Sequence, residues 1–200
     1  MRERAWLKTL GILGTLDTLG NQLTDSNTRL MSEPQSDTLT LRDAFRKADF
    51  SGKLALAIAS WFGAGLMPGA PGTFGTLMAV PLVLALNHLG ELYEGLALLL
   101  LVPTAIWASS LCERGLGRND PPEVVVDEVA GFLLTLFLLP LSWLTLCFGF
   151  VLFRFFDIAK PFPIRWLEKR LRGGTGVVFD DLLAGIYANL SLRLLMLWIS

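Results

Sequence analysis

Long stretches without charged side chains make up most of the chain after its first quarter. No Asp, Glu, Lys or Arg occurs in residues 54–90, 95–112 or 129–153, and residues 182–199 carry only Arg193. Apolar runs of this length are typical of membrane helices, whereas half-buried strands alternate polar and apolar residues. The pattern predicts an all-α, membrane-associated fold, a compact bundle of about five to seven helices.

Proline and glycine divide these runs. The segment 68–76 holds two prolines and three glycines, which predicts a loop, with Thr73 as the cap of the helix that follows. Pro81 and Pro103 stand inside apolar runs and predict kinked helices. Pro140 is expected to split the longest run into two helices.

The first 50 residues differ from the rest. They are polar and predict a poorly ordered tail. A short amphipathic helix on the membrane surface is expected over 38–53, where apolar residues recur at helical spacing, at Leu41, Phe45 and Ala48. A helical domain is expected over 51–200.

Composition narrows the class of protein. Hydrophobic residues make up 52% of the chain and charged residues 18%, and the mean hydropathy is +0.53, which argues against an ordinary soluble enzyme. A net charge of −1 offers no basic face for nucleic acid. Basic residues gather between apolar segments, at 114–118 and 154–172, and the positive-inside rule predicts that these connections face the cytoplasm.

Seven acids lie where apolar segments begin or end, Asp120 and Glu123 among them. Asp127 and Glu128 precede the uncharged run, Asp157 follows it, and Asp180 and Asp181 open the last apolar segment. The helix dipole favours acids in a first turn, but two tandem pairs and Asp157 exceed what capping needs. Carboxylates near a bilayer are costly and repel one another unless a cation neutralises them.

A short repeat brings two of these acids together. The pattern Asp127-x-x-Ala130-Gly131 recurs as Asp181-x-x-Ala184-Gly185. Each Asp lies one turn before a patch of small residues on the same helix face, and such patches allow helices to approach closely. Two helices that meet there would place Asp127 near Asp181.

The donor types predict Mg²⁺ and a phosphate. Carboxylates without His or Cys suit this hard cation, whose shell substrate phosphate often completes, and the expected ligands are Asp127, Glu128, Asp157, Asp180 and Asp181. Basic residues interleave with Asp157 and are candidates for neutralising phosphate, although positive-inside flanking also explains them: Arg154, Lys160 and Arg165. Backbone N–H groups at Gly72 and Thr73, and in the glycine-rich segment 173–176, are candidate anion donors.

Other phosphoryl-transfer routes lack their residues. The single histidine, His88, stands in an apolar setting, neither cysteine has the spacing of a thiol phosphatase, and no Asp-x-Asp occurs. Metal-activated water acting on a phosphoryl group remains. Two other functions stay open: a phosphatidyltransferase-like lipid enzyme, although the chain lacks the Asp-Gly of that motif, and a non-enzymatic carrier or channel subunit that binds a cation at intramembrane acids.

Four blocks of sequence, in order, resemble the phosphatidylglycerophosphatase A family. They are LMPGAPGTFGTL at 66–77, VDEVAG at 126–131, FRFFDIAKPFPI at 153–164, and GGTG followed by DDLLAG at 173–176 and 180–185. Together they cover roughly residues 58–190. The resemblance implies a mostly helical phosphatase of the bacterial inner membrane, with its active site on the cytoplasmic side. It further implies hydrolysis of phosphatidylglycerophosphate to phosphatidylglycerol and phosphate with Mg²⁺.

We therefore assign the following expected roles. Catalysis is expected from Asp127, Glu128, Asp157, Asp181 and Lys160, with one carboxylate as general base. Phosphate binding is expected from Arg154, Arg165, Gly72 and Thr73. The expected partners are the phospholipid substrate and the bilayer.

Overall fold

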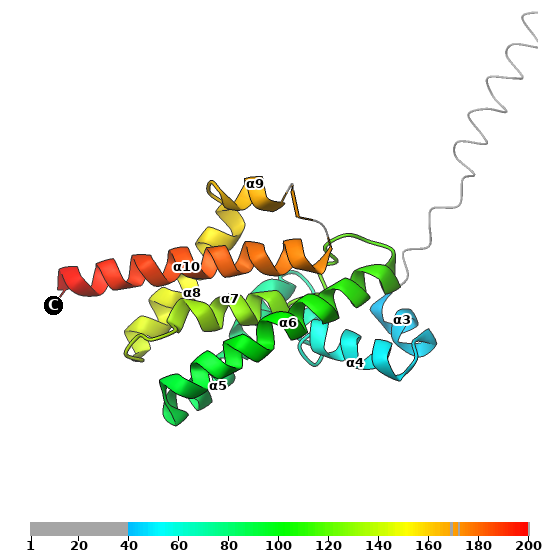
Figure 1. The fold of residues 1–200 in the computed structure, drawn as a ribbon, viewed down its shortest axis with the longest axis horizontal. Coiled ribbons are helices and arrows are strands. Elements are labelled where there is room, and N and C mark those ends of the chain that lie inside the picture. The colour runs from blue at the N-terminus through cyan, green and yellow to red at the C-terminus, as the bar shows by residue number, and fades with distance from the viewer. Residues whose placement is uncertain (1–39, 169, 172, 200) are drawn as a thin grey trace, which may run out of the picture. The chain divides into compact units, whose positions relative to one another are not determined.

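The computed structural model describes residues 40–168, 170–171 and 173–199 (Figure 1). All regular structure in these residues is helical, which confirms the all-α prediction. After α3 (Leu41–Lys47), seven α-helices form the domain: α4 (Phe50–Ala59), α5 (Pro71–Leu89), α6 (Glu91–Leu116), α7 (Val126–Leu136), α8 (Trp143–Ala159), α9 (Ile164–Glu168) and α10 (Gly174–Ile199). A short 3₁₀ turn, η1 (Ala64–Leu66), precedes α5.

The amphipathic helix expected over 38–53 is broken in two. Most of the predicted tail, residues 1–39, lies outside the described part of the chain. Beyond it, α3 ends at Lys47 and α4 begins at Phe50. Asp49 separates them because its side chain accepts a hydrogen bond from the backbone N–H of Gly52 and so caps a new helix.

Proline acts in two ways along the bundle. Pro140 lies in the turn between α7 and α8, as predicted, whereas Pro81 and Pro103 lie inside continuous helices. The loop predicted over 68–76 ends earlier, because α5 begins at Pro71. Proline at a first helical position has the required φ and lacks only an N–H that would have no partner there. Thr73 therefore lies in the first turn of α5 and does not cap it.

Helix α7 is the centre of the bundle. It packs against α4, α5, α6, α8 and α10, and all its residues are buried except Glu128 and Leu134, which are partly exposed. Its aromatic core joins it to α8, with the Phe132 ring centroid 6.1 Å from those of both Phe150 and Phe153. Figure 1 shows α6, α7 and α10 side by side along the long axis.

The repeated small patches are the contact between α7 and α10. A Cβ on Gly131 would lie 2.6 Å from the carbonyl oxygen of Asp181, and a Cβ on Gly185 would overlap the carbonyl oxygen of Gly131. Only glycine allows this approach of two backbones. The predicted meeting of the two repeats is confirmed.

Three helices of the described residues are long and apolar enough to cross a membrane: α5, α6 and α10. Large apolar side chains cover the outside, including Leu100 on α6, Val151 on α8 and Leu197 on α10, which are 63–78% exposed. An exterior of this kind would be unstable in water and is the expected surface towards lipid. The protein is membrane-associated.

We expect Gly131→Ala to destabilise the bundle, because its Cβ would meet the Asp181 backbone and the Phe153 ring at 2.6 Å. Overpacking of this kind costs about 1–3 kcal/mol. Thermal unfolding in detergent measures the loss. Gly115→Ala is the matched control, since its Cβ meets nothing within 4 Å; equal melting temperatures of the two variants would contradict the close contact.

Candidate active site

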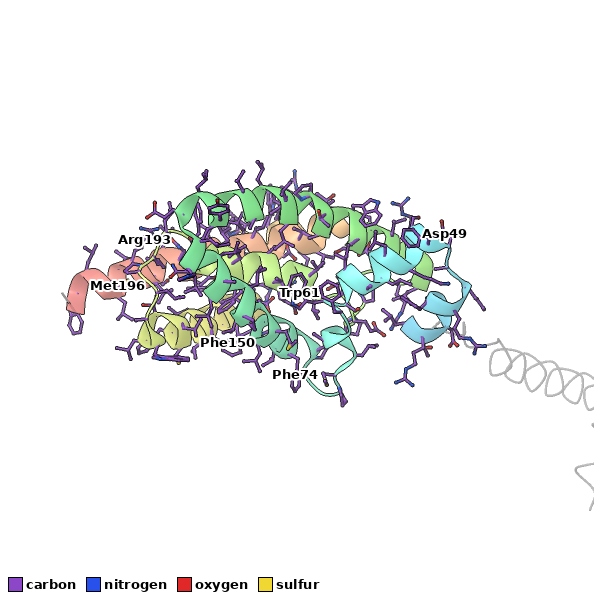
Figure 2. The ribbon with its side chains drawn as sticks, turned by 90° about the horizontal axis from the view of Figure 1, so that it is seen from below. Asp49, Trp61, Phe74, Phe150, Arg193 and Met196 are labelled. Atoms are coloured by element: carbon purple, nitrogen blue, oxygen red, sulfur yellow. The ribbon has the colours of Figure 1, made fainter. Side chains whose placement is uncertain are left out.

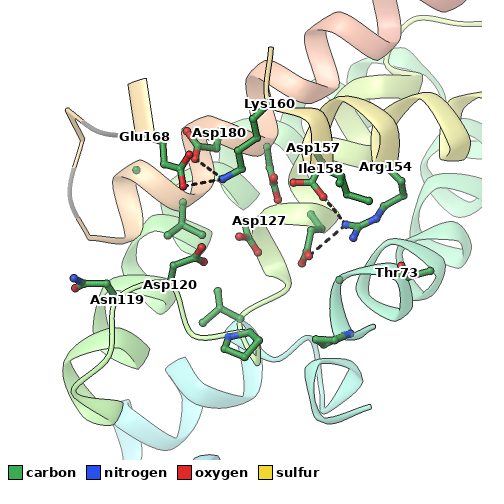
Figure 3. Close-up of a pocket in the computed structure, with 18 of the residues that line it drawn as sticks. Thr73, Asn119, Asp120, Asp127, Arg154, Asp157, Ile158, Lys160, Glu168 and Asp180 are labelled. Atoms are coloured by element: carbon green, nitrogen blue, oxygen red, sulfur yellow. Dashed lines mark hydrogen bonds and ion pairs between the residues drawn. The ribbon is translucent and has the colours of Figure 1, made fainter. Parts of the chain in front are cut away.

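A cavity of about 1010 Å³ opens at the end of the domain where α5, α7 and α10 begin (Figure 3). Among its described lining residues are eight acids and two cations, Arg154 and Lys160. The acids are Glu113, Asp120, Asp127, Glu128, Asp157, Glu168, Asp180 and Asp181. So many carboxylates around two cations make the cavity a site for positive charge.

Three of these carboxylates lie close together. One oxygen from each of Asp127, Glu128 and Asp181 lies within 4.8 Å of the others. Asp127 Oδ1, Glu128 Oε2 and Asp181 Oδ2 are buried and have no hydrogen-bond partner among the described residues. Buried acceptors are rarely left without a hydrogen bond. Hard oxygen ligands that converge on one point fit a divalent cation such as Mg²⁺.

The surroundings oppose ionisation of this group in the absence of a cation. Burial raises the pKa of Asp127 to about 7, and the charge of Asp120 adds to the effect. Burial, followed by the charge of Asp127, also raises the pKa of Glu128 well above its usual range. A bound cation would stabilise the ionised carboxylates and so lower these pKa values.

Arg154 joins the acid group to its neighbour Asp157. Its Nη1 lies 2.6 Å from Asp157 Oδ2 and 3.5 Å from Glu128 Oε1. Arg154 and Asp157 are three residues apart on α8, so they share a helix face. The guanidinium is thus held at the edge of the carboxylate group, within reach of an anion that binds there.

Lys160 lies at a second position in the cavity and holds Asp180. Its Nζ lies 3.1 Å from Asp180 Oδ2 and 3.2 Å from Glu168 Oε1. Although burial opposes its charge, the Asp180 carboxylate raises the pKa of Lys160. Figure 3 shows the two ion-pair clusters, around Lys160 and around Arg154, on separate sides of Asp127. Asp180, expected among the metal ligands, is therefore a partner of Lys160 and stands outside the three-carboxylate group.

Gly72 and Thr73 line the cavity from the first turn of α5. First-turn N–H groups have no acceptor within their own helix, so they are available to an anion. A Cβ on Gly72 would overlap Glu128 Oε1 and lie 3.0 Å from Arg154 Nη1. The glycine lets α5 approach both side chains.

Arg165 is the one expected site residue that the structure does not bring to the cavity. It is exposed on α9, whose buried residue is Ile164 and whose cavity residue is Glu168. Residues 164 and 168 share a helix face, and Arg165 points about 100° away from it. Its expected role in phosphate binding therefore has no geometric support.

Two acids of the cavity, Glu113 and Glu168, were not predicted, and Asp120 was noted beside an apolar segment but was given no role in the site. Glu113 ends an apolar run, as the predicted acids do, and its Oε1 accepts a hydrogen bond from the backbone N–H of Asp120 at 3.0 Å. Asp120 has a left-handed backbone, with φ of 46°. Glu168 carries no signal in the sequence, because its role depends on the fold of α9 against Lys160.

Comparison with known proteins decides the family. Residues 57–196 match the family model of Phosphatidylglycerophosphatase A. The chain belongs to the phosphatidylglycerophosphatase A family. Membership of this family confirms the prediction of an enzyme, a phosphatase.

Individual relatives agree with this assignment. The chain is 35% identical over 130 residues to Phosphatidylglycerophosphatase A of Escherichia coli (strain K12), covering 64% of this chain and 76% of that protein. It is 38% identical over 150 residues to Phosphatidylglycerophosphatase A of Haemophilus influenzae, covering 70% and 88%. A Putative phosphatidylinositol-3-phosphatase of Bacteroides thetaiotaomicron is 40% identical over 144 residues, covering 68% and 89%. No solved structure matches the chain significantly.

We expect Gly72→Ala to lower phosphatase activity sharply while the bundle stays folded. The new methyl group would displace Glu128 and Arg154, and shifts of about 1 Å near a reacting group cost up to about a hundredfold in rate. Initial phosphate release, normalised to folded protein, measures the effect. Unchanged turnover would contradict the tight packing of α5 on the site, and Gly115→Ala again serves as the matched control.

We expect the metal-free protein to lose stability as pH rises. Folded-state pKa values of Asp127 and Glu128 lie above the usual carboxyl range near 4, so the stability that their protons confer is complete at acid pH. That stability is lost as pH passes through the raised values, towards and beyond 7. Melting temperatures in EDTA at pH 5.5 and 7.5 should differ by several degrees, and Asp127→Asn should reduce the difference. A flat profile would show that burial does not hold these acids protonated.

Proposed function

We propose that the protein hydrolyses the terminal phosphate monoester of phosphatidylglycerophosphate, giving phosphatidylglycerol and inorganic phosphate, with Mg²⁺ at Asp127, Glu128 and Asp181. The observation that carries the proposal is the convergence of three carboxylates, each with one buried and unpartnered oxygen, beside an arginine and a helix N-terminus. The substrate follows the names of two relatives. A third relative is named for a phosphoinositide, so the shared chemistry is a phosphate monoester on a lipid headgroup.

Mg²⁺ bound there would stabilise negative charge on the phosphoryl oxygens and lower the pKa of a water ligand. The chain's own groups complete the reaction. Arg154 neutralises a phosphoryl oxygen, and Asp157 keeps its guanidinium in place at 2.6 Å. First-turn N–H groups of α5 donate to another oxygen. A carboxylate of the cavity accepts the proton of the attacking water.

Lys160 contributes at a distance from the acid group. Its ammonium is shared between Asp180 and Glu168, so it orders the start of α10 and the α9 segment. Since Asp181 follows Asp180 directly, this pairing also fixes the entry of Asp181 into the cluster.

The bundle orients this chemistry relative to the bilayer. The cavity lies where α5 and α10 begin and α6 ends, so all three membrane-length helices have their cavity ends on one side. The basic connection 154–172 adjoins the cavity. We therefore propose that the active site faces the cytoplasm from the bacterial inner membrane, with the acyl chains of the substrate remaining in the bilayer.

Substitution of the cluster tests the function directly. Asp127→Asn and Glu128→Gln should each lower phosphate release from phosphatidylglycerophosphate by at least about a hundredfold, since even the outer partners of metal sites cost 10–100-fold. Glu91→Gln, an exposed acid in the first turn of α6, is the matched control and should retain activity. Malachite-green assays of purified protein in mixed micelles supply the rates.

Two further sets of assays test the metal and the substrate separately. Activity should vanish in EDTA and return with Mg²⁺; activity that persists in EDTA would refute the metal. Phosphatidylinositol 3-phosphate and phosphatidic acid, assayed beside phosphatidylglycerophosphate, test the headgroup. Faster release from either of them would refute the assigned substrate but not the phosphatase.

A further inference from the structure

Helix α7 is short and ends at a buried residue, Leu136. Its 11 residues span about 16 Å, roughly half of a bilayer core of about 30 Å. The carbonyl groups of its last turn have no donor within the helix. In a membrane such groups must be satisfied by protein, because water is absent.

Two side chains of α10 supply these donors. Asn189 Nδ2 donates to the carbonyl oxygens of Thr135 at 2.9 Å, Phe137 at 3.0 Å and Leu134 at 3.3 Å. Arg193 Nη2 donates to the carbonyl oxygens of Phe137 and Leu138, both at 3.1 Å. The two side chains are linked, since Arg193 Nε donates to Asn189 Oδ1 at 2.8 Å. Four carbonyl groups at the end of α7 are thus served by one helix.

A third helix, α6, also bonds to this turn. Glu94 Oε2 accepts a hydrogen bond from the backbone N–H of Leu138 at 3.3 Å, and its Oε1 accepts one from Asn87 Nδ2 at 3.2 Å. Glu94 is buried, 5% exposed. Leu138 has a left-handed backbone, with φ of 56°, that this pairing fixes. Figure 2 shows Arg193 towards the end of the domain remote from Asp49.

Residues of α10 contact residues of α7 at a constant offset in sequence, from the cavity to this turn. Asp181, Gly185, Asn189 and Arg193 follow one another at intervals of four and form one ridge along α10. Asp181 joins the acid group with Asp127, Gly185 meets Gly131, and Asn189 bonds to Thr135, 54 positions earlier. The offset is the same at all three levels, so α7 and α10 run parallel without slipping.

We propose that Asn189 and Arg193 are positioning residues, which set the height of α7 against α10 and thereby bring Asp127 and Glu128 level with Asp181. They act through the helix, because neither lines the cavity. The glycine contact resists separation of the helices but leaves sliding along their axes open. The amide and the guanidinium bond to fixed carbonyl groups and oppose that sliding. The inference rests on the proposed metal site.

Asn189→Leu tests it, since leucine has a similar volume and no donor. We expect kcat to fall about tenfold to a hundredfold and the Mg²⁺ concentration for half-maximal activity to rise about tenfold, with KM for the lipid within about twofold. Asn189→Gln, which keeps the amide, should recover part of both losses. Leu190→Ala, at the adjacent, half-exposed position, should behave like the unaltered protein.

A direct measurement of metal binding separates positioning from general damage. Mn²⁺ titration followed by electron paramagnetic resonance should show weaker binding to Asn189→Leu, in protein that elutes as one species and melts within a few degrees of the unaltered enzyme. If Asn189→Leu does not fold, Arg193→Lys takes its place, because lysine keeps the charge and loses the fork of donors. Unchanged metal binding in a folded variant overturns the positioning role. Absence of any Mg²⁺ dependence in the unaltered enzyme overturns the metal site instead.

Discussion

The close crossing of α7 and α10 at Gly131 and Gly185 is the contact on which the rest of the structure depends. Backbone meets backbone there, so the acids one turn earlier, Asp127 and Asp181, are forced into one small volume. Packing energy from the surrounding core offsets their mutual repulsion. A larger residue at either glycine would separate the helices and move the carboxylates of the acid group apart.

Electrostatics then divides the cavity into two parts. Arg154 lies at the edge of the buried acid group, and its single positive charge cannot neutralise the carboxylates there. Lys160 is already shared by two other carboxylates. The deficit of positive charge is concentrated where the unpartnered oxygens are buried. The buried acid group and the guanidinium of Arg154 therefore lie together at one end of an otherwise apolar bundle.

The apolar bundle also carries the polar groups of the cavity on helices whose outer faces are apolar. Helices α5, α6 and α10 are long enough to cross a bilayer, but the central helix α7 is not. Its end is satisfied by Asn189, Arg193 and Glu94. Short central helices of this kind allow a catalytic segment to lie between longer ones, provided that neighbouring side chains supply its missing hydrogen bonds.

Much of this arrangement can be predicted from the amino-acid sequence alone. Uncharged runs determined the helical class, Pro140 determined the break after α7, and the paired Asp-x-x-Ala-Gly segments determined which helix faces meet, because these features depend only on local spacing. The close approach of α5 to the acid group at Gly72, the pairing of Asp180 with Lys160 and the outward position of Arg165 were decided by tertiary structure. Each depends on which side chains arrive from distant segments: Glu128 and Arg154 beside Gly72, Glu168 beside Lys160, and Ile164 in the core. Sequence spacing sets the face of a helix on which a residue lies, but only the packing of whole helices sets what that face meets.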